Sequence, residues 1–274
     1  MTTLPTIAIL GAGSMGGAIL SGLLQPGVRT EGIRVTNRTH HKADAVRSEH
    51  VISLAVDGDP DANAIAVDGA KIVIIGVKPA MVPDLLRQVA PALAPDAIVV
   101  SVAAGVTIAT MESIVLNPVV RAMPNTPAVV GKGVTGVSGG SRTTEADVAL
   151  VTALFQTVGD VLVIPESKID ALSTISGSGP AYVFLLMEEL TRTAVSLGFS
   201  ASEAAVMVNT TFLGASELLA SSAGVPPEEL RRRVTSPKGT TEKAIEVMQA
   251  ADLGGMFDRA TAAALARARE IAAG

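Results

Sequence analysis

The chain has 274 residues, which is enough for one large domain or two ordinary ones. It is 48% hydrophobic but only 2% aromatic, so its core must be aliphatic, and few rings are available to stack on the bases of single-stranded nucleic acid. The formal net charge of −5 argues against a nucleic-acid-binding surface, and the absence of Cys excludes disulfides, thiolate nucleophiles and Cys-ligated metals.

The N-terminus lacks the basic, apolar and cleavage regions of a signal peptide, and no apolar run approaches the length of a membrane span. We therefore expect a soluble, cytoplasmic protein that has neither nucleic acid nor a membrane as a partner. We assign no metal site.

A glycine-rich motif near the N-terminus organises the first half of the chain. Ile7–Leu10 is a continuous apolar run, as expected of a parallel strand buried on both faces, and Ala18–Leu24 continues as a helix. Between them, Gly11, Gly13 and Gly16 have the spacing of a dinucleotide-binding turn. Gly11 permits the tight turn, Gly13 lets a pyrophosphate approach the backbone, and Gly16 lets helix and strand pack closely. The helix N-terminus would offer its N–H groups to the phosphates.

The end of the second expected strand, Ile33–Thr36, bears on the choice of coenzyme. An NAD-binding domain usually has an acidic residue there, which accepts hydrogen bonds from the ribose 2′-hydroxyl. This chain has Asn37 and Arg38 instead, and a guanidinium can clamp a 2′-phosphate with two hydrogen bonds. The motif favours NADP over NAD. The alternative is an ordinary solvated helix start, which Asn and Thr commonly cap.

The next two strands lead to a second candidate contact. A short strand at Ile52–Val56 is followed by a polar segment, and Lys71–Val77 is another buried strand. Pro79 cannot continue a sheet ladder, so the strand ends there. Lys78 is thus expected at the carboxyl edge of the sheet, where open α/β sheets bind ligands. The alternative is a lysine that merely ends a strand.

Further elements of the same kind complete a coenzyme-binding domain, which we assign to residues 1–164. The two prolines of Pro124–Pro127 indicate a rigid turn with free side-chain donors. We expect strands at Ala97–Val102, Val119–Met123, Val134–Ser138 and Asp160–Ile164, and helices at Val82–Leu93, Met111–Val115 and near Thr144–Val158.

Residues 165–274 show no alternating pattern and are predicted to form an all-α domain. Their apolar side chains recur at steps of three and four residues, which is typical of helices that pack on helices. Arg231–Arg233 is most simply a solvated helix face rather than a polyanion site. Because so many apolar faces are hard to bury in a domain of this size, we expect a second copy of the chain to cover them. The stripes are Val183, Met187, Leu190, Ala194 and Leu197; Ala205, Val208, Phe212, Ala215 and Leu219; and Phe257, Ala260, Ala264, Ala268 and Ile271.

The available acid–base groups restrict the chemistry. His40, His41 and His50 all lie beside the expected adenosine end, away from a nicotinamide ring, and the second half has few lysines. A common alcohol dehydrogenase needs a His or Lys that handles the alcohol proton. The inventory therefore favours a C=N substrate, since an iminium already carries the activating proton.

Two motifs of the second half differ from core packing. Ser176–Tyr182 opens a long helix, with Pro180 in its first turn and free amides just before it. Val234–Thr241 precedes a helix at Glu242–Met248. A segment rich in Gly, Ser and Thr at a helix N-terminus can hold a carboxylate. The alternative for each is ordinary N-capping by Ser or Thr.

Taken together, these motifs resemble those of the pyrroline-5-carboxylate reductases. They span nearly the whole chain in the family's order, and the last two are specific. One departure is Lys238, where the family more often has Gly, and which would either crowd the loop or place a positive charge beside the substrate. The matching segments are Gly11–Gly16, Val35–Arg38, Val77–Pro79, Arg121–Pro127, Ser176–Tyr182 and Val234–Thr241.

The resemblance implies an α/β Rossmann-type dinucleotide-binding domain followed by an all-α dimerisation domain. NADPH, with NADH also possible, would deliver hydride to the C=N carbon of 1-pyrroline-5-carboxylate, a cyclic imino acid, and give L-proline in the last step of proline biosynthesis. The chain would form a homodimer, assembled further into larger rings, in which the Ser236–Thr241 loop of one chain completes the coenzyme site of the other.

The resemblance also assigns site residues. Ser236, Gly239, Thr240 and Thr241 would bind the substrate, and Thr241 would hydrogen-bond the imine nitrogen and is the candidate to protonate it. The coenzyme would be held by Gly11, Gly13, Ser14, Met15, Gly16, Asn37, Arg38, Asn63, Val77, Lys78, Pro79 and Asn125.

Other functions remain open from the residues alone. A β-hydroxyacid dehydrogenase shares the glycine motif and a helical second domain, but it would want a lysine in Tyr182–Leu197, which has none. Another NADP-dependent imine reductase, or a redox sensor that binds NADP(H) without turning it over, would share the coenzyme motif.

Overall fold

The structure is a computed structural model that describes residues 3–273, with side chains up to Glu270. The chain divides into two compact units. The first unit comprises the chain up to Ser178 and the residues from Ala264 onward. The second unit is Gly179–Ala263. The side chain of Ile271, a member of the third predicted stripe, lies outside the described part.

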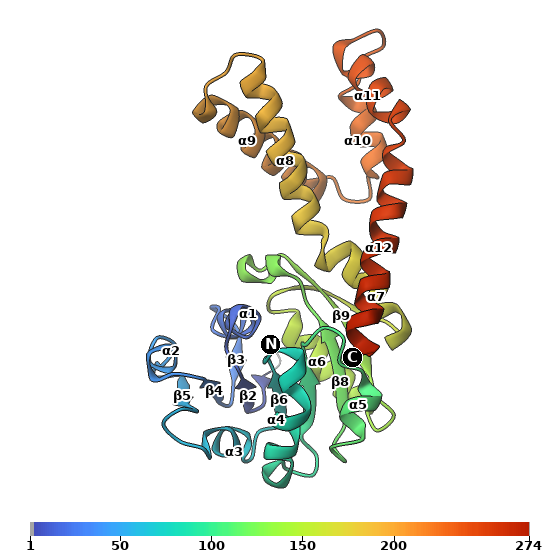
Figure 1. The fold of residues 1–274 in the computed structure, drawn as a ribbon. Helices are drawn as coiled ribbons and strands as arrows, with labels where there is room; N and C mark the ends of the chain where they lie inside the picture. Colours follow the sequence, from blue (N-terminus) through green and yellow to red (C-terminus); the bar gives the residue numbers. More distant parts are fainter. Residues whose placement is uncertain (1–2, 274) are drawn as a thin grey trace. The chain divides into compact units, whose positions relative to one another are not determined.

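The first unit is built on an eight-stranded sheet with the order β10-β9-β8-β7-β6-β2-β4-β5 (Figure 1). The ladder is parallel from β5 to β8, β9 is antiparallel to β8, and β10 is parallel to β9. The chain moves outward from β2 first to β4 and then, on the other side, to β6, so the carboxyl ends of these three strands form a topological switch point. The strands are β2 Ile7–Leu10, β4 Ile33–Asn37, β5 Val51–Ala55, β6 Ile72–Ile75, β7 Ile98–Ser101, β8 Val119–Met123, β9 Gly133–Gly139 and β10 Gly159–Val163; β1 Thr3–Leu4 and β3 Arg29–Thr30 form a separate parallel pair.

Helices cover both faces of this sheet, which confirms the Rossmann-type fold. Successive residues of β2 point to opposite faces: Ile7 and Ile9 pack in one apolar cluster, Ala8 and Leu10 in the other. The first cluster includes α1 Ser14–Leu23 and α6 Glu145–Phe155; the second includes α3 Ala62–Val67, α4 Val82–Val89 and α5 Ile108–Glu112. The short helix α2 His40–Asp44 follows β4.

The expected strands lie within one or two residues of the observed ones, and the helix ends differ for local reasons. The helix expected at Val82–Leu93 ends as α4 at Val89, because Pro91 has no N–H and a 3₁₀ turn follows. The helix expected at Met111–Val115 begins earlier, at Ile108, because the Thr107 hydroxyl accepts the Thr110 N–H at 3.1 Å and caps it.

The chain between β10 and the second unit is helical throughout. A 3₁₀ turn at Glu166–Lys168 leads into α7 Ile169–Leu172 and then into a π-helix at Ser173–Gly177. The amides expected to be free before the long helix are therefore not all free, since the Ser178 N–H donates to the Ser173 carbonyl at 2.9 Å.

The second unit is entirely helical in the described residues, as the pattern predicts. Its helices are amphipathic, but few of their apolar side chains are buried. Ala194, Ala204 and Val208 are buried, whereas Phe184 is 65% and Leu197 74% exposed. The rings of Tyr182 and Phe257 lie 6.4 Å apart within this unit. The helices are α8 Gly179–Ser196, α9 Ala201–Ser221, α10 Pro227–Arg233, α11 Thr240–Ala250 and α12 Leu253–Ala273, whose last turns belong to the first unit.

Candidate active site

The glycine turn after β2 has the geometry that a bound pyrophosphate requires. Gly11 has a φ of 92°, and a Cβ there would lie 3.2 Å from the Gly76 carbonyl oxygen. A Cβ on Gly16 would lie only 2.5 Å from the Gly11 carbonyl oxygen, so helix and strand pack as closely as the sequence suggests. A Cβ on Gly13, by contrast, would meet nothing within 4 Å. The backbone there is open to a ligand, and no side chain caps α1, which begins at the next residue.

Sequence reasoning missed Gly76, which it treated as an ordinary strand residue. A Cβ on Gly76 would lie 2.5 Å from the Gly11 carbonyl oxygen. Only a glycine at this position lets the end of β6 approach the turn after β2. The signal was a single glycine that interrupts an apolar strand just before its end.

A pocket of about 520 Å³ opens beside this turn, at the carboxyl ends of β4 and β6. It brings together the predicted residues Gly11, Asn37, Arg38, Asn63 and Val77. Its other wall comes from the 3₁₀ turn after β6 and from α4, which the sequence did not indicate. These added residues are Ala80, Met81, Asp84, Leu85 and Gln88.

The polar side chains that the sequence predicts for this pocket fall into two groups. Asn37 and Asn63 are buried and already held: Asn37 Nδ2 donates to the Lys42 carbonyl at 3.4 Å, and Asn63 Nδ2 to Gln88 Oε1 at 3.1 Å. Arg38 is exposed, and its guanidinium has no hydrogen bond or ion pair with any described residue. It is therefore available to an anion at the mouth of the pocket.

Lys78 and Pro79 lie at the same edge of the sheet. Pro79 begins a 3₁₀ turn, and the Met81 N–H donates to the Lys78 carbonyl at 2.9 Å. The Lys78 side chain is exposed and, within the described part of the chain, pairs with no acid.

Asn125 was predicted to contact the coenzyme, but its side chain is committed within the protein. It is 8% exposed, Oδ1 accepts the Val134 N–H at 2.8 Å, and Nδ2 donates to the Ser176 carbonyl at 2.9 Å. Each of its polar atoms thus already has a partner.

A buried ion-pair group, which the sequence did not reveal, joins β8 to the helical segment that follows β10. The Arg121 side chain in β8 is only 4% exposed and contacts Asp170 at 2.6 Å and Glu166 at 3.4 Å. Glu166 Oε1 also accepts the Ile108 N–H at 2.7 Å. These contacts fix the start of the helical segment to β8 and to α5.

The predicted substrate loop is a single turn in the second unit. Gly239 N–H donates to the Ser236 carbonyl at 2.9 Å, and α11 begins at Thr240, so Thr240 and Thr241 are its first two residues. The hydroxyls of Ser236, Thr240 and Thr241 are exposed and make no hydrogen bond to other described residues. Lys238 has a φ of 62°, a left-handed conformation that ordinarily favours glycine.

The charges near this loop match an ordinary solvated helix face. Arg232 and Arg233 of α10 both bind Glu229, at 2.7 and 2.9 Å, which lowers the pKa of that carboxyl to about 2. Because two of the three arginines pair with Glu229, the Arg231–Arg233 run is consistent with the solvated helix face that the sequence suggests.

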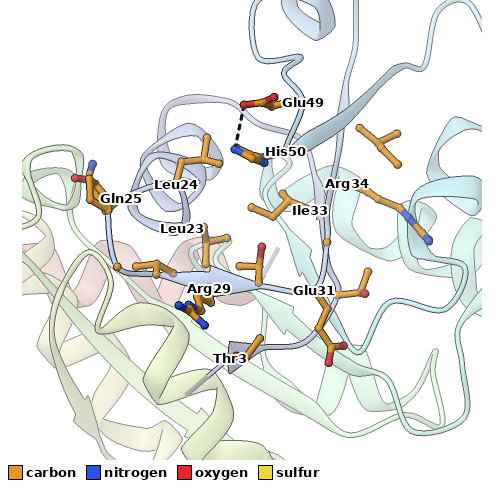
Figure 2. A pocket seen from close by; sticks show the side chains of 17 residues that line it. Thr3, Leu23, Leu24, Gln25, Arg29, Glu31, Ile33, Arg34, Glu49 and His50 are labelled. Carbon is orange, nitrogen blue, oxygen red and sulfur yellow. Dashed lines mark ion pairs between the residues drawn. The ribbon is translucent and has the colours of Figure 1, made fainter. Parts of the chain in front are cut away.

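A further hollow of about 740 Å³ lies elsewhere on the first unit (Figure 2). It is lined by Leu23, Leu24, Arg29 and Glu31, and His50 at its rim pairs with Glu49. Because it lies at the amino ends of β2 and β4, opposite the glycine turn, it is not where an open α/β sheet binds its ligand. The carboxyl edge is therefore the candidate active site.

Family models match both parts of the chain. Residues 6–105 match the model described as NADP oxidoreductase coenzyme F420-dependent, and residues 166–271 match pyrroline-5-carboxylate reductase dimerisation. Among the described residues, no helix is long and apolar enough to cross a membrane.

Similar proteins cover nearly the whole chain. The pyrroline-5-carboxylate reductase of Corynebacterium melassecola is 38% identical, with 97% of this chain and 98% of that protein covered. The Pseudomonas aeruginosa enzyme of the same name is also 38% identical, over 98% and 97%. A solved pyrroline-5-carboxylate reductase from Coxiella burnetii has a TM-score of 0.87 at 33% identity, with 97% of both chains covered.

Two more distant structures share the fold alone. The Plasmodium falciparum pyrroline carboxylate reductase, solved with NADP bound, has a TM-score of 0.81 at 24% identity, over 97% of this chain and 98% of that one. A 3-hydroxyisobutyrate dehydrogenase from Mycobacterium tuberculosis reaches a TM-score of only 0.53 at 18% identity, over 76% and 70%.

Proposed function

The chain belongs to the pyrroline-5-carboxylate reductase family, and on that premise we propose how its own residues carry out the reaction. The reaction is the reduction of 1-pyrroline-5-carboxylate to L-proline by hydride transfer from NAD(P)H, the last step of proline biosynthesis. The observation that supports this function in the structure is an open glycine turn beside a 520 Å³ pocket at the carboxyl edge of the sheet.

The residues at this edge fit a dinucleotide. Gly11, Gly13, Ser14, Met15 and Gly16 would hold the pyrophosphate with backbone groups and the N-terminus of α1. The adenosine end would lie beside Asn37, Arg38 and Asn63, and the chain from Val77 through Lys78 to Pro79 would line the path toward the nicotinamide. When bound, the coenzyme supplies the hydride.

NADPH is the proposed preference over NADH. Arg38 is exposed at the pocket mouth and pairs with no residue that the structure describes, so it can bind a 2′-phosphate without first breaking such a contact. Asn37 leaves this position without the carboxylate that would repel that phosphate.

The substrate would be held by the turn that precedes α11. Its carboxylate suits the N–H groups at the helix N-terminus, which no described side chain caps, and the exposed hydroxyls of Ser236 and Thr240, with Gly239 letting the backbone approach. Thr241 would hydrogen-bond the ring nitrogen and is the proposed proton donor. The protein's main contribution would be to position two bound reactants and to exclude water.

We also propose where the two domains meet and how the chains assemble. The matched dimerisation region starts at residue 166, next to the proposed boundary between 1–164 and 165–274, and it supports a homo-oligomer. We propose an interlocked dimer that assembles into larger rings, with the Ser236–Thr241 turn of one chain completing the coenzyme site of another. The cytoplasm stays the location that the sequence predicts.

The first test is direct. Purified protein should oxidise NADPH rapidly when 1-pyrroline-5-carboxylate is added and negligibly without it. NADPH binding without turnover would instead favour a redox sensor.

The second test removes one hydroxyl. Thr241→Val keeps the side chain's shape, so kcat should fall roughly 10–1,000-fold while the Kd of NADPH is unchanged. Thr241→Ser is the matched control, because it keeps the hydroxyl and should retain most of the activity. An unchanged kcat in the valine variant would reduce Thr241 to a residue of the helix start.

A further inference from the structure

The π-helix that precedes α8 contains a carbonyl whose usual α-helical donor is missing. In an α-helix the carbonyl of Ser176 would accept the N–H of the residue four positions on, but that residue is Pro180, which has no N–H. The backbone here forms the π-helix Ser173–Gly177. A side chain supplies a donor instead, since Asn125 Nδ2 donates to the Ser176 carbonyl at 2.9 Å.

The other end of the Asn125 side chain is fixed to the sheet. Oδ1 accepts the N–H of Val134 in β9 at 2.8 Å, and the residue is buried. Asn125 therefore connects the strand edge to the π-helix with two hydrogen bonds. The packing beside it is tight, because a Cβ on Gly177 would lie 2.9 Å from Ser173 Oγ and 3.9 Å from the Met123 side chain.

The segment that Asn125 holds is one wall of a small pocket in the first unit. This pocket, of about 290 Å³, lies between the loop after β7, β8, the π-helix and the last turns of α12. Its lining includes Gly105, Met123, Ser173 and Ser178. All of these elements meet at the carboxyl edge of the sheet, where the glycine turn also lies.

The strand order places this pocket on the reacting side of the coenzyme site. Arg38 and Asn37 follow β4, on one side of β2, whereas β6, β7 and β8 lie on the other. Neighbouring strands are about 4.8 Å apart, so β7 and β8 stand roughly 10 and 14 Å from β2. A dinucleotide with its adenosine over β4 therefore extends its nicotinamide toward β7 and β8.

We propose that Asn125 is a positioning residue for hydride transfer rather than a contact to the coenzyme. By donating to the carbonyl that Pro180 leaves without its helical partner, it fixes the π-helix, which lines this pocket through Ser173 and leads into Ser178, as a wall of the nicotinamide end. The inference rests on the proposed function, and it replaces the direct contact that the sequence suggests for this side chain.

The test is a double-mutant cycle between Asn125 and Pro180. Asn125→Asp keeps the size of the side chain and an acceptor for the Val134 N–H, but it has no donor for the Ser176 carbonyl. We expect kcat to fall about 10–100-fold, because small misplacements near reacting atoms are costly, with the Kd of NADPH within about twofold. Pro180→Ala restores an N–H at position 180. In that background, the kcat loss from Asn125→Asp should shrink at least about threefold.

Asn117 offers a matched control at the amino end of the same strand. It is also buried, and its Nδ2 donates to the Ala94 and Ala97 carbonyls at 2.8 and 3.1 Å. Asn117→Asp should lower the free energy of unfolding but leave kcat unchanged, and Pro180→Ala should not alter its effect. If Asn125→Asp does not fold, Asn125→Ala, which adds no charge, is measured in the same two backgrounds.

Two results would overturn the proposal. An equal kcat loss in both backgrounds would show that the Ser176 carbonyl is not the target of Asn125. A weakened NADPH Kd with unchanged kcat would make Asn125 a coenzyme contact. Wild-type protein assayed with 1-pyrroline-5-carboxylate tests the proposed function separately, and the coupling between the two positions is measured independently through unfolding free energies.

Discussion

Arg38 is the side chain on which the proposed preference for NADPH depends. It lies at the mouth of the proposed coenzyme pocket and pairs with no described residue, so its removal should cost NADPH a charge-assisted contact and NADH nothing. Such a contact is worth about 1.5–3 kcal/mol, so Arg38→Ala should weaken NADPH binding roughly 10–150-fold. Titration of coenzyme fluorescence gives both Kd values. Arg29→Ala, an exposed arginine far from this pocket, is the control, and equal losses for NADPH and NADH would contradict the assignment.

Lys238 carries a backbone cost that can be measured. Its φ of 62° costs a side-chain-bearing residue about 1–2 kcal/mol, whereas a glycine adopts this conformation freely. After allowing for the greater freedom of glycine in the unfolded chain, Lys238→Gly should raise the free energy of unfolding by about 0.5–1 kcal/mol. Lys243→Gly, inside α11, should lower it by about 1 kcal/mol. Denaturant unfolding of the two variants separates them, and destabilisation by both would mean that Lys238 makes contacts that outweigh its strain.

At the scale of elements, the parts that the sequence predicts best are those governed by local chemistry. The run Ile7–Leu10 is buried on both faces. The glycine spacing after it is informative because a Cβ at Gly11 or Gly16 would lie too close to backbone atoms of the same site. The short strands, too, lie where apolar runs meet Gly or Pro. The strand and the glycine turn can therefore be predicted without knowing which distant residues they contact.

The elements that escaped prediction depend on partners far away in the sequence. The π-helix Ser173–Gly177 is stabilised by Asn125, which lies some fifty positions earlier, and no periodicity reveals it. The ion-pair group of Arg121, Glu166 and Asp170 likewise joins a strand to a later helix. Strand β9 runs antiparallel to β8, to which a short connection joins it. The order of apolar and polar residues within β9 does not indicate this direction.

Helix α10 gives a pH prediction. Arg232 and Arg233 lower the pKa of Glu229 to about 2, from an ordinary value of about 4.5. A depressed pKa contributes stability that is present above the unfolded-state value and is lost as the pH falls toward about 2. Glu229→Gln should therefore flatten the decline in stability between about pH 5 and 2. Unfolding followed across this range checks it, with Glu228→Gln as control. An unchanged pH profile would mean that the pairs contribute nothing in solution.

At the scale of the whole molecule, the second unit is not self-sufficient. Its amphipathic helices leave Phe184 65% and Leu190 48% exposed, and apolar surface of this extent marks an interface. The dimerisation region covers these helices, so the sequence pattern and the family agree on a partner chain. The proposed assembly raises the question of which copy supplies the turn before α11 to each coenzyme site.

Complementation between two damaged chains can answer that question. Gly13→Asp should block coenzyme binding without a steric clash, since a Cβ at this position meets nothing within 4 Å, while the carboxylate repels the pyrophosphate. Thr241→Val should impair chemistry alone. In a mixed dimer with a shared site, one of the two sites takes its glycine turn and its Thr241 from undamaged segments. Random pairing makes half of the dimers mixed, so about a quarter of wild-type activity should return. If each site lies within one chain, every site in the mixture carries a lesion, and activity stays at the mutant level. A monomer by light scattering at micromolar concentration would refute the shared site outright.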